Sequence, residues 1–201
     1  MTDRREFLRY AMVSVPLATS VAFDAAAGVR SAAGDVSSAI RHVVVDSRHA
    51  ECRAFGASLA EAGATVHALA DGDATDLWQR TLAPAWSDAP VAVAGLTRAP
   101  ALFILEQLAW SHGLRVVFHA EHVVSGTAPA AHHILRAPAA GPSAGQLDRF
   151  DSLWPDRIAD LVAAFAPPPA ATGRPGPTSS GLLPSLPAGS ELLTSWIIAP
   201  A

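Results

Sequence analysis

Short apolar runs alternate with segments of helical length along the middle of the chain. The runs have the length of buried strands and lie at 42–45, 65–70, 91–94 and 115–118. The helical candidates lie between them, at 50–62, 75–86 and 99–112. This alternation predicts an α/β fold: a Rossmann-like or flavodoxin-like doubly wound, mostly parallel sheet of four to five strands in a single domain.

The stretch 91–122 shows the pattern most fully. An apolar run is followed by a small-residue turn at 95–97, and then by the segment 99–112, which is apolar on nearly every face. Gly113 is placed as a helix stop before a second β-branched run. Two apolar strands joined by a helix form a βαβ crossover, in which both strands are parallel and covered on both faces.

The pattern is less regular beyond this unit. We expect a fifth strand at 131–137 and a helix at 147–165, with Pro155 inside it. Residues 167–190 are rich in Pro, Gly and Ser, a composition typical of an extended segment. Residues 191–201 become apolar again and include Trp196, so we expect this end to dock on its own sheet or on a partner.

The first residues carry the most specific motif of the chain. Arg4 and Arg5 form a pair, Phe7 and Leu8 follow after one residue, and Arg9 supplies a further basic side chain. This arrangement resembles the twin-arginine (Tat) export motif, in which an arginine pair precedes a Phe-Leu pair and a basic residue. The resemblance implies export of a protein that folds before it crosses the membrane, and it says nothing about the domain that follows.

The rest of the N-terminal region agrees with an export signal. A moderately apolar stretch at 10–23 leads to three alanines at 25–27, which suit a cleavage site. An amphipathic helix or a membrane anchor is the alternative, but about 14 apolar residues fall short of the ~20 that span a bilayer. We therefore expect a signal peptide at 1–27, a flexible tether at 28–40 and the α/β domain at 41–166, in a protein that is periplasmic or secreted.

Composition excludes several classes of function. The net charge is -4, and the chain has no lysine, so its basic residues are all arginines, which are scattered. A nucleic-acid-binding surface is therefore not expected, nor is a basic run for anionic membranes. The single Cys52 excludes an internal disulfide and a thiolate zinc site, and no sequence motif for a cofactor is present.

Polar side chains follow each of the four predicted strands. In an open parallel sheet, ligands bind outside the carboxyl ends of the strands, so these side chains mark the expected ligand edge. The ligand-binding candidates there are Ser47, Arg48, Asp71, Gly95, Arg98 and Glu121, and the catalytic candidates are Asp46, Thr97, His119 and His122. Asp46 is a candidate general base, Gly95 permits close backbone approach at the floor of a cleft, and Arg98 could bind a carboxylate or phosphate. Helix capping is the alternative role for the Asp and Thr residues.

The histidines are side chains of a type that binds metals, but their spacing in the sequence does not match a known metal-binding motif. His119 and His122 fit neither of the helical zinc motifs, and on an extended segment they point to opposite faces. We therefore expect no metal, and hydrogen-bonded structural histidines instead. Neither Ser47 nor Thr97 lies in a nucleophile elbow, so a covalent hydrolase is not favoured.

Two functions remain after these exclusions. The first is a small-ligand-binding or accessory subunit of a secreted redox enzyme system, with a possible protein partner co-exported through Tat. The alternative is a small periplasmic enzyme, hydrolase-like or metal-dependent, that uses the four catalytic candidates. The enzyme requires those four side chains within hydrogen-bond reach of one another in one pocket. The accessory role predicts that they lie apart, beside an exposed apolar patch formed by the last residues, 191–201.

Overall fold

A single mixed sheet organises the domain. The computed structural model describes residues 39–69, 71–126, 128–137, 143–166 and 186–200. The expected signal peptide lies outside these residues, as do nearly all of the expected tether and most of the Pro/Gly/Ser-rich segment. The described residues belong to one compact unit. Among them, no helix has the length and apolar content that crossing a membrane requires.

Six strands form the sheet, in the order β2-β1-β3-β6-β4-β5. They are β1 (Ile40–Asp46), β2 (Thr65–Leu69), β3 (Ala92–Arg98), β4 (Leu114–Ser125), β5 (Ala128–Arg136) and β6 (Glu191–Pro200). β1 is parallel to both β2 and β3, whereas β6 is antiparallel to β3 and β4, and β5 is antiparallel to β4. The α/β class is confirmed, but the expected four-to-five-stranded, mostly parallel sheet is wrong, because three of the five pairings are antiparallel.

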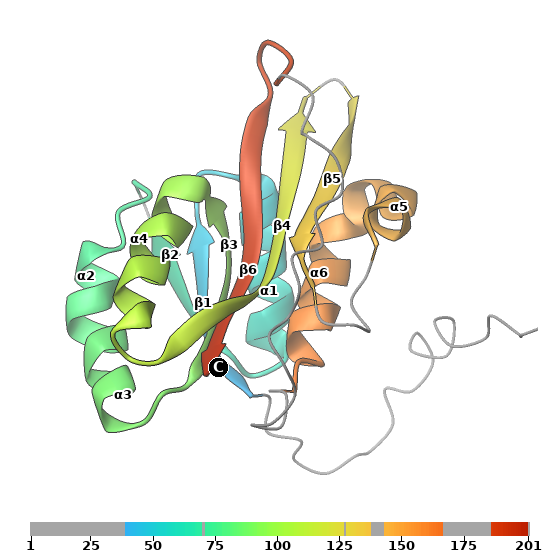
Figure 1. The fold of residues 1–201 in the computed structure, drawn as a ribbon. Coiled ribbons are helices and arrows are strands. Elements are labelled where there is room, and N and C mark those ends of the chain that lie inside the picture. Colours follow the sequence, from blue (N-terminus) through green and yellow to red (C-terminus); the bar gives the residue numbers. More distant parts are fainter. Residues whose placement is uncertain (1–38, 70, 127, 138–142, 167–185, 201) are drawn as a thin grey trace, which may run out of the picture. The chain divides into compact units, whose positions relative to one another are not determined.

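The last strand causes this difference. β6 lies between β3 and β4, so the two strands of the predicted βαβ unit run in the same direction but do not pair (Figure 1). Leu193, Trp196, Ile197 and Ile198 are each 0% exposed, so this strand crosses the centre of the core. The apolar end of the chain therefore docks on its own sheet, and it does not form the exposed apolar patch that was expected there.

Strand β6 also lengthens its neighbours. Residues 95–97 belong to β3 rather than to a turn, because Gly95, Leu96 and Thr97 pair with residues of β6. β4 likewise continues through Ser125, since its second half pairs with β5 and β6 on either side. The predicted ends of the third and fourth strands were therefore too early, and several residues expected in loops are held in the sheet.

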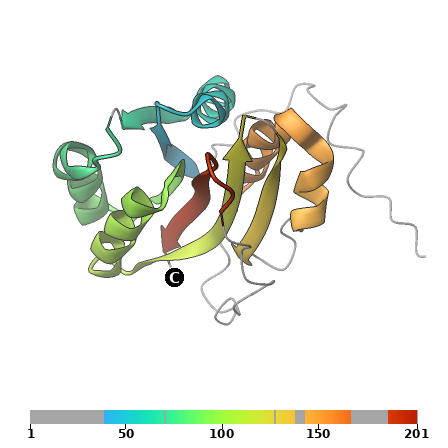
Figure 2. The ribbon, with the colours of Figure 1, turned by 90° about the horizontal axis from the view of Figure 1, so that it is seen from above.

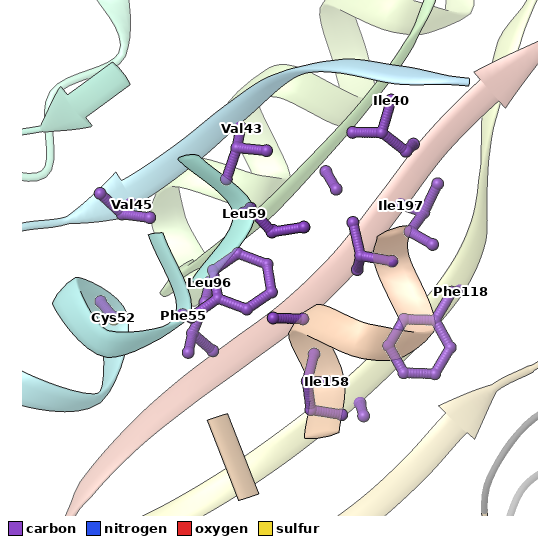
Figure 3. Packing of buried hydrophobic residues seen from close by; sticks show 14 of the residues in the cluster. Ile40, Val43, Val45, Cys52, Phe55, Leu59, Leu96, Phe118, Ile158 and Ile197 are labelled. Carbon is purple, nitrogen blue, oxygen red and sulfur yellow. The ribbon is translucent and has the colours of Figure 1, made fainter. Parts of the chain in front are cut away.

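Helices cover both faces of the sheet (Figure 2). They are α1 (Ala50–Glu61), α2 (Thr75–Leu77), a π-helical turn (Trp78–Leu82), α3 (Ala83–Asp88), α4 (Ala99–Trp110), α5 (Ala144–Leu147), a 3-10 turn (Asp148–Leu153) and α6 (Trp154–Ala163). One face packs against α1 and α6, where Phe55 and Ile158 meet Val43, Leu96 and Ile197 (Figure 3). The other face packs against the region 75–88 and α4, where Leu105 is 0% exposed. We call these the α6 face and the α4 face.

Helix α4 is buried on one side only. Phe103, Ile104 and Trp110 are 63%, 44% and 49% exposed, whereas Leu102, Leu105 and Ala109 pack on the sheet. The sequence of this helix is apolar on nearly every face, but the sheet covers only its inner side. An exposed set of large apolar side chains on one helix is the kind of surface that proteins use to bind partners.

Candidate functional site

Two of the predicted site residues at the end of β1, Asp46 and Arg48, form an ion pair. The Asp46 carboxylate is 0% exposed and accepts two hydrogen bonds from the Arg48 guanidinium, at 2.8 Å from Nε and 2.6 Å from the terminal nitrogen. The Arg48 backbone N–H donates a third, at 3.2 Å. Burial alone would raise the pKa of Asp46, but the hydrogen bonds from Arg48 and its charge outweigh burial and lower that pKa. A carboxylate with a lowered pKa and with both oxygens bound to Arg48 is a weak proton acceptor, so Asp46 is poorly suited to act as a general base.

The neighbouring candidates do not complete a site around this pair. His49 lies 3.3 Å from the Glu191 carboxylate at the start of β6, which ties the end of β1 to the last strand. The Ser47 hydroxyl donates to the Leu69 carbonyl at 3.4 Å, while Asp71 and Arg98 are exposed. These contacts join strand ends to one another, which is a structural role.

This ion pair predicts how an isosteric change affects stability. Asp46→Asn should lower the free energy of unfolding at pH 7 by about 1.5–3 kcal/mol, because it removes charge-assisted hydrogen bonds to a buried acceptor. The folded pKa of Asp46 is lowered, so its contribution is present above the unfolded-state value of about 4 and is lost as the pH falls through the folded value. Urea titrations should therefore show a difference that shrinks below about pH 4. A constant difference across that range would contradict the pairing.

Gly95 lies under an indole ring of the protein's own last strand. A Cβ atom at this position would come within 2.4 Å of Trp196 Cζ2, and the Trp196 Nε1–H donates to the Thr97 hydroxyl at 3.1 Å. The Thr97 hydroxyl in turn donates to the Arg98 carbonyl at 3.1 Å. Gly95 was expected to admit a ligand, whereas in the structure it admits the Trp196 side chain.

His119 and His122 point to opposite faces of β4, as the strand period predicts. The His122 ring stacks on Trp154, the first residue of α6, with 4.3 Å between ring centroids. His119 is paired with Trp196, which packs against α4. Paired residues of antiparallel strands share a face, so His119 lies on the α4 face.

On the α6 face, His122 is the centre of a hydrogen-bonded chain. Its Nε2 lies 2.7 Å from the Ser195 hydroxyl, and its Nδ1 lies 2.8 Å from His132 Nδ1. Burial lowers the pKa of His122 well below its ordinary value, and burial is also the main cause that lowers the pKa of His132. His122 and Ser195 are each 0% exposed, so this chain is satisfied internally and closed to solvent.

On the α4 face, four polar residues form one rung across the sheet. Thr97 of β3 pairs with Thr194 of β6, Thr194 pairs with Glu121 of β4, and Glu121 pairs with His133 of β5. Thr194 is two residues from Trp196 on the same strand, so it shares the α4 face with that ring. We call Thr97, Thr194, Glu121 and His133 the polar row. It lies toward the carboxyl ends of β3 and β4, where α/β sheets bind ligands.

The polar row contains buried atoms without hydrogen bonds. Within the described part of the chain, the buried side-chain N and O atoms that lack a partner are Thr194 Oγ1, His133 Nδ1 and His133 Nε2. Glu121 Oε2 lies 3.9 Å from His133 Nδ1, which is too long for a hydrogen bond. The side chains of His133 and Glu121 are 14% and 18% exposed, whereas Thr194 is fully buried.

The row is bounded by a second rung on the same face. His119 pairs with Arg136, whose guanidinium donates to the Val116 carbonyl at 2.8 Å. Burial, and then the charge of Arg136, lower the pKa of His119 to about 4, so this imidazole is neutral at neutral pH. Over the residues described, no three His, Cys, Asp or Glu side chains converge as a metal site would require.

The four catalytic candidates therefore lie apart, in different contacts. Asp46 is in an ion pair, Thr97 is bonded to Trp196, and His119 and His122 face opposite ways. Sequence reasoning singled out Thr97 and Glu121 but missed Thr194, His133 and Ser195 as site residues. Alternation along the last apolar run would have placed Thr194 and Ser195 on opposite faces, but the partners of each depend on register, which the sequence does not show.

Comparison with known proteins does not assign the chain to a family. No protein-family model, no curated protein and no solved structure matches the chain. What the protein does is therefore inferred from the contacts of its own residues.

Proposed function

We propose that the chain is a Tat-exported, periplasmic or secreted accessory protein that binds a small polar ligand at the polar row. The observation that carries the proposal is the fully buried Thr194 hydroxyl without a hydrogen bond, in the same rung as the His133 imidazole, whose two nitrogens also lack partners. Native proteins satisfy nearly all buried polar atoms, and one left unpaired costs about 1–3 kcal/mol. Three such atoms on two residues of one rung, with Glu121 between them, indicate groups kept for something that binds them.

Binding is favoured over catalysis by the separation of the candidate catalytic groups. No hydrogen bond or ion pair described for the domain joins any two of Asp46, Thr97, His119 and His122. General acid–base chemistry needs such groups within hydrogen-bond reach of one reacting atom. Thr194, Glu121 and His133, in contrast, are neighbours in register, which suits recognition of one small molecule.

A pair of threonine variants tests this proposal. Thr194→Val should raise the free energy of unfolding by about 1 kcal/mol or more, because it replaces an unpaired buried hydroxyl by a methyl of similar shape. Thr97→Val should lower it by about 1–3 kcal/mol, because it removes the acceptor of the Trp196 N–H. Both residues are fully buried in the same rung, so the second is a matched control for the first.

The same pair gives the functional measurement. Urea titration supplies the two stabilities, and native mass spectrometry of protein purified from its own compartment supplies the bound mass. We expect a co-purifying small molecule with the wild type and its loss with Thr194→Val, despite the higher stability. If Thr194→Val destabilises the protein as Thr97→Val does, the hydroxyl has an internal partner and the proposal fails.

Export is a separate part of the proposal, supported by the resemblance of the first residues to the Tat motif. Replacing Arg4 and Arg5 by Lys should keep the protein uncleaved in the cytoplasm, since the motif requires both guanidinium groups. Cell fractionation with immunoblotting measures this, and a variant with Arg9→Lys is the control that should still be exported. Export of the double Lys variant through the general secretory route would contradict the proposed export through Tat.

The accessory role needs a surface for a protein partner, and the outer side of α4 supplies a suitable one. Phe103 and Trp110 are seven residues apart, and Ile104 lies beside them, so the three cover about two turns. Replacing Phe103 and Trp110 by Ser should abolish co-purification of a co-exported partner while leaving the fold intact. Arg80→Ser, on another exposed helical turn, is the control. Unchanged co-purification would place the partner elsewhere.

A serine hydrolase is the second candidate, and one observation favours it. The Ser195 hydroxyl, His122 and His132 have the contacts of a nucleophile, a base and an orienting group. Burial disfavours the imidazolium that such a base must form, so we rank this function second. A fluorophosphonate probe that labels the wild type but not Ser195→Ala would establish it. An unlabelled wild type would exclude it.

A further inference from the structure

We propose that the ligand of the polar row carries a protonated amine, and that Glu121, Thr194 and His133 are the groups that bind it. This inference rests on the proposed function, because it names the ligand class of the same site. It follows from three features of the row: the kind of atoms left unpaired, the charge that remains unbalanced, and the apolar rung beside it.

The first feature is a surplus of hydrogen-bond acceptors. An ionised Glu121 is an acceptor only. The Thr194 hydroxyl has two lone pairs and one O–H, and a neutral His133 ring has one acceptor nitrogen and one N–H, so acceptors outnumber donors in the three side chains. Two of these three side chains hold atoms without partners, and Glu121 lies between them in register. A primary ammonium has three N–H donors and no acceptor, so it complements three acceptors on one face.

The second feature is the charge of Glu121. Among the described residues, its one ion-pair contact is with His133, at 3.9 Å. Arg136, the cationic group of the next rung, donates instead to the Val116 carbonyl, and its pair partner His119 is neutral at neutral pH. A carboxylate that is 18% exposed and lacks a strong counter-charge favours a cationic ligand over an anionic one.

A divalent metal ion would also satisfy a carboxylate and an imidazole. Glu121 and His133 are two protein ligands, whereas structural zinc sites use four and catalytic zinc sites use three. The described residues supply no third His, Cys, Asp or Glu at the required geometry. An ammonium needs no more acceptors than the row provides, so it is the better match.

The third feature sets the kind of amine. The next rung on the same face pairs Val123 with Leu192, and both side chains are half-buried. An alkyl chain attached to the ammonium would cover these apolar groups once the charged end is bound to Glu121. A short alkylamine is therefore the simplest probe of the site.

The experiment compares three probes that differ in one functional group. n-Butylammonium, n-butanol and butyrate are titrated at equal ionic strength into the full-length protein, and NMR follows the methyl groups of Thr194, Val123 and Leu192. We expect saturable shifts with n-butylammonium at all three residues. Glu121→Gln should weaken its binding about tenfold or more, because it removes a charge-assisted contact. Glu61→Gln, an equal change of charge on the exposed end of α1, should have no effect.

The outcomes separate the ligand class from the site. If n-butanol or butyrate shifts these methyl groups and n-butylammonium does not, the polar row binds a ligand but that ligand is not an amine. The proposed function would then hold, and the inferred ligand class would be wrong. If none of the three probes shifts these methyl groups, both the inferred ligand class and the proposed ligand site at the polar row are wrong. Equal binding of n-butylammonium by the wild type and Glu121→Gln would also overturn the inference, since the carboxylate would then take no part.

Discussion

Gly95→Ala is expected to destabilise the protein by about 3 kcal/mol, a large effect for one added methyl group. The new Cβ would lie 2.4 Å from Trp196 Cζ2 and 2.7 Å from the Val44 carbonyl oxygen. The indole is fully buried, and the carbonyl belongs to the paired strand β1, so neither atom can move away without disturbing the sheet. Close packing in the core turns this overlap into strain.

The measurement is a urea titration set against a glycine that has room. Gly145→Ala, in α5, adds a Cβ with no atom within 4 Å, and it should leave stability unchanged or raise it by up to about 1 kcal/mol. A double-mutant cycle with Trp196→Leu identifies the cause. If the indole is responsible, Gly95→Ala should cost much less in the Trp196→Leu background. An equal cost in both backgrounds would point to Val44 alone.

This expectation differs from the one that the sequence suggests for Gly95. A glycine between an apolar strand and a helix indicates a loop where a ligand approaches the backbone. The structure places the same glycine inside β3, with a side chain of the protein itself in the space that a ligand would need. The glycine correctly indicated that another group packs closely against the backbone at this position. The sequence could not show that this group is the side chain of Trp196, about a hundred residues later.

The elements that were predicted well depend on local patterns. β1, β2 and α1 match their predicted ranges closely because each has its own apolar periodicity and a glycine or polar end. Strand direction was also correct for β3 and β4, since a helical crossover fixes it. Local patterns could not supply which strands become neighbours, because β5, α5, α6 and the segment after α6 separate β6 from β4 along the chain.

The polar row shows the same limit for the site. Thr97 and Glu121 stood out as polar residues near strand ends, and they do belong to one rung. Their link is Thr194, which lies inside an apolar run and by composition looks like an interruption of it. A shift of one residue in the register of β6 would place Ser195 on the α4 face instead. The site is therefore a property of strand register, and register is set by the packing of Trp196 and its neighbours.

Removal of residues 191–201 should abolish cooperative folding, the largest effect expected for any change discussed. Leu193, Trp196, Ile197 and Ile198 are each fully buried in β6, and burial of such side chains contributes about 1.5–3 kcal/mol apiece. Their sum is comparable to the whole stability of a typical domain, about 5–15 kcal/mol. The deletion also leaves β3 and β4 without their shared partner, so the sheet is divided into a three-stranded part and a two-stranded part.

A synthetic peptide of residues 187–201 should restore the fold when it is added to the shortened chain. Its apolar positions fix the register against β3 and β4, so recovery should follow peptide concentration as a binding equilibrium. Circular dichroism and a urea transition measure recovery, and a peptide with Ile197→Lys is the control that should fail, because it puts a charge into the core on the α6 face. A shortened chain that still unfolds cooperatively at the original urea midpoint would show that β6 is peripheral. That result would also remove Thr194 from the centre of the sheet, and with it the basis for a ligand site at the polar row.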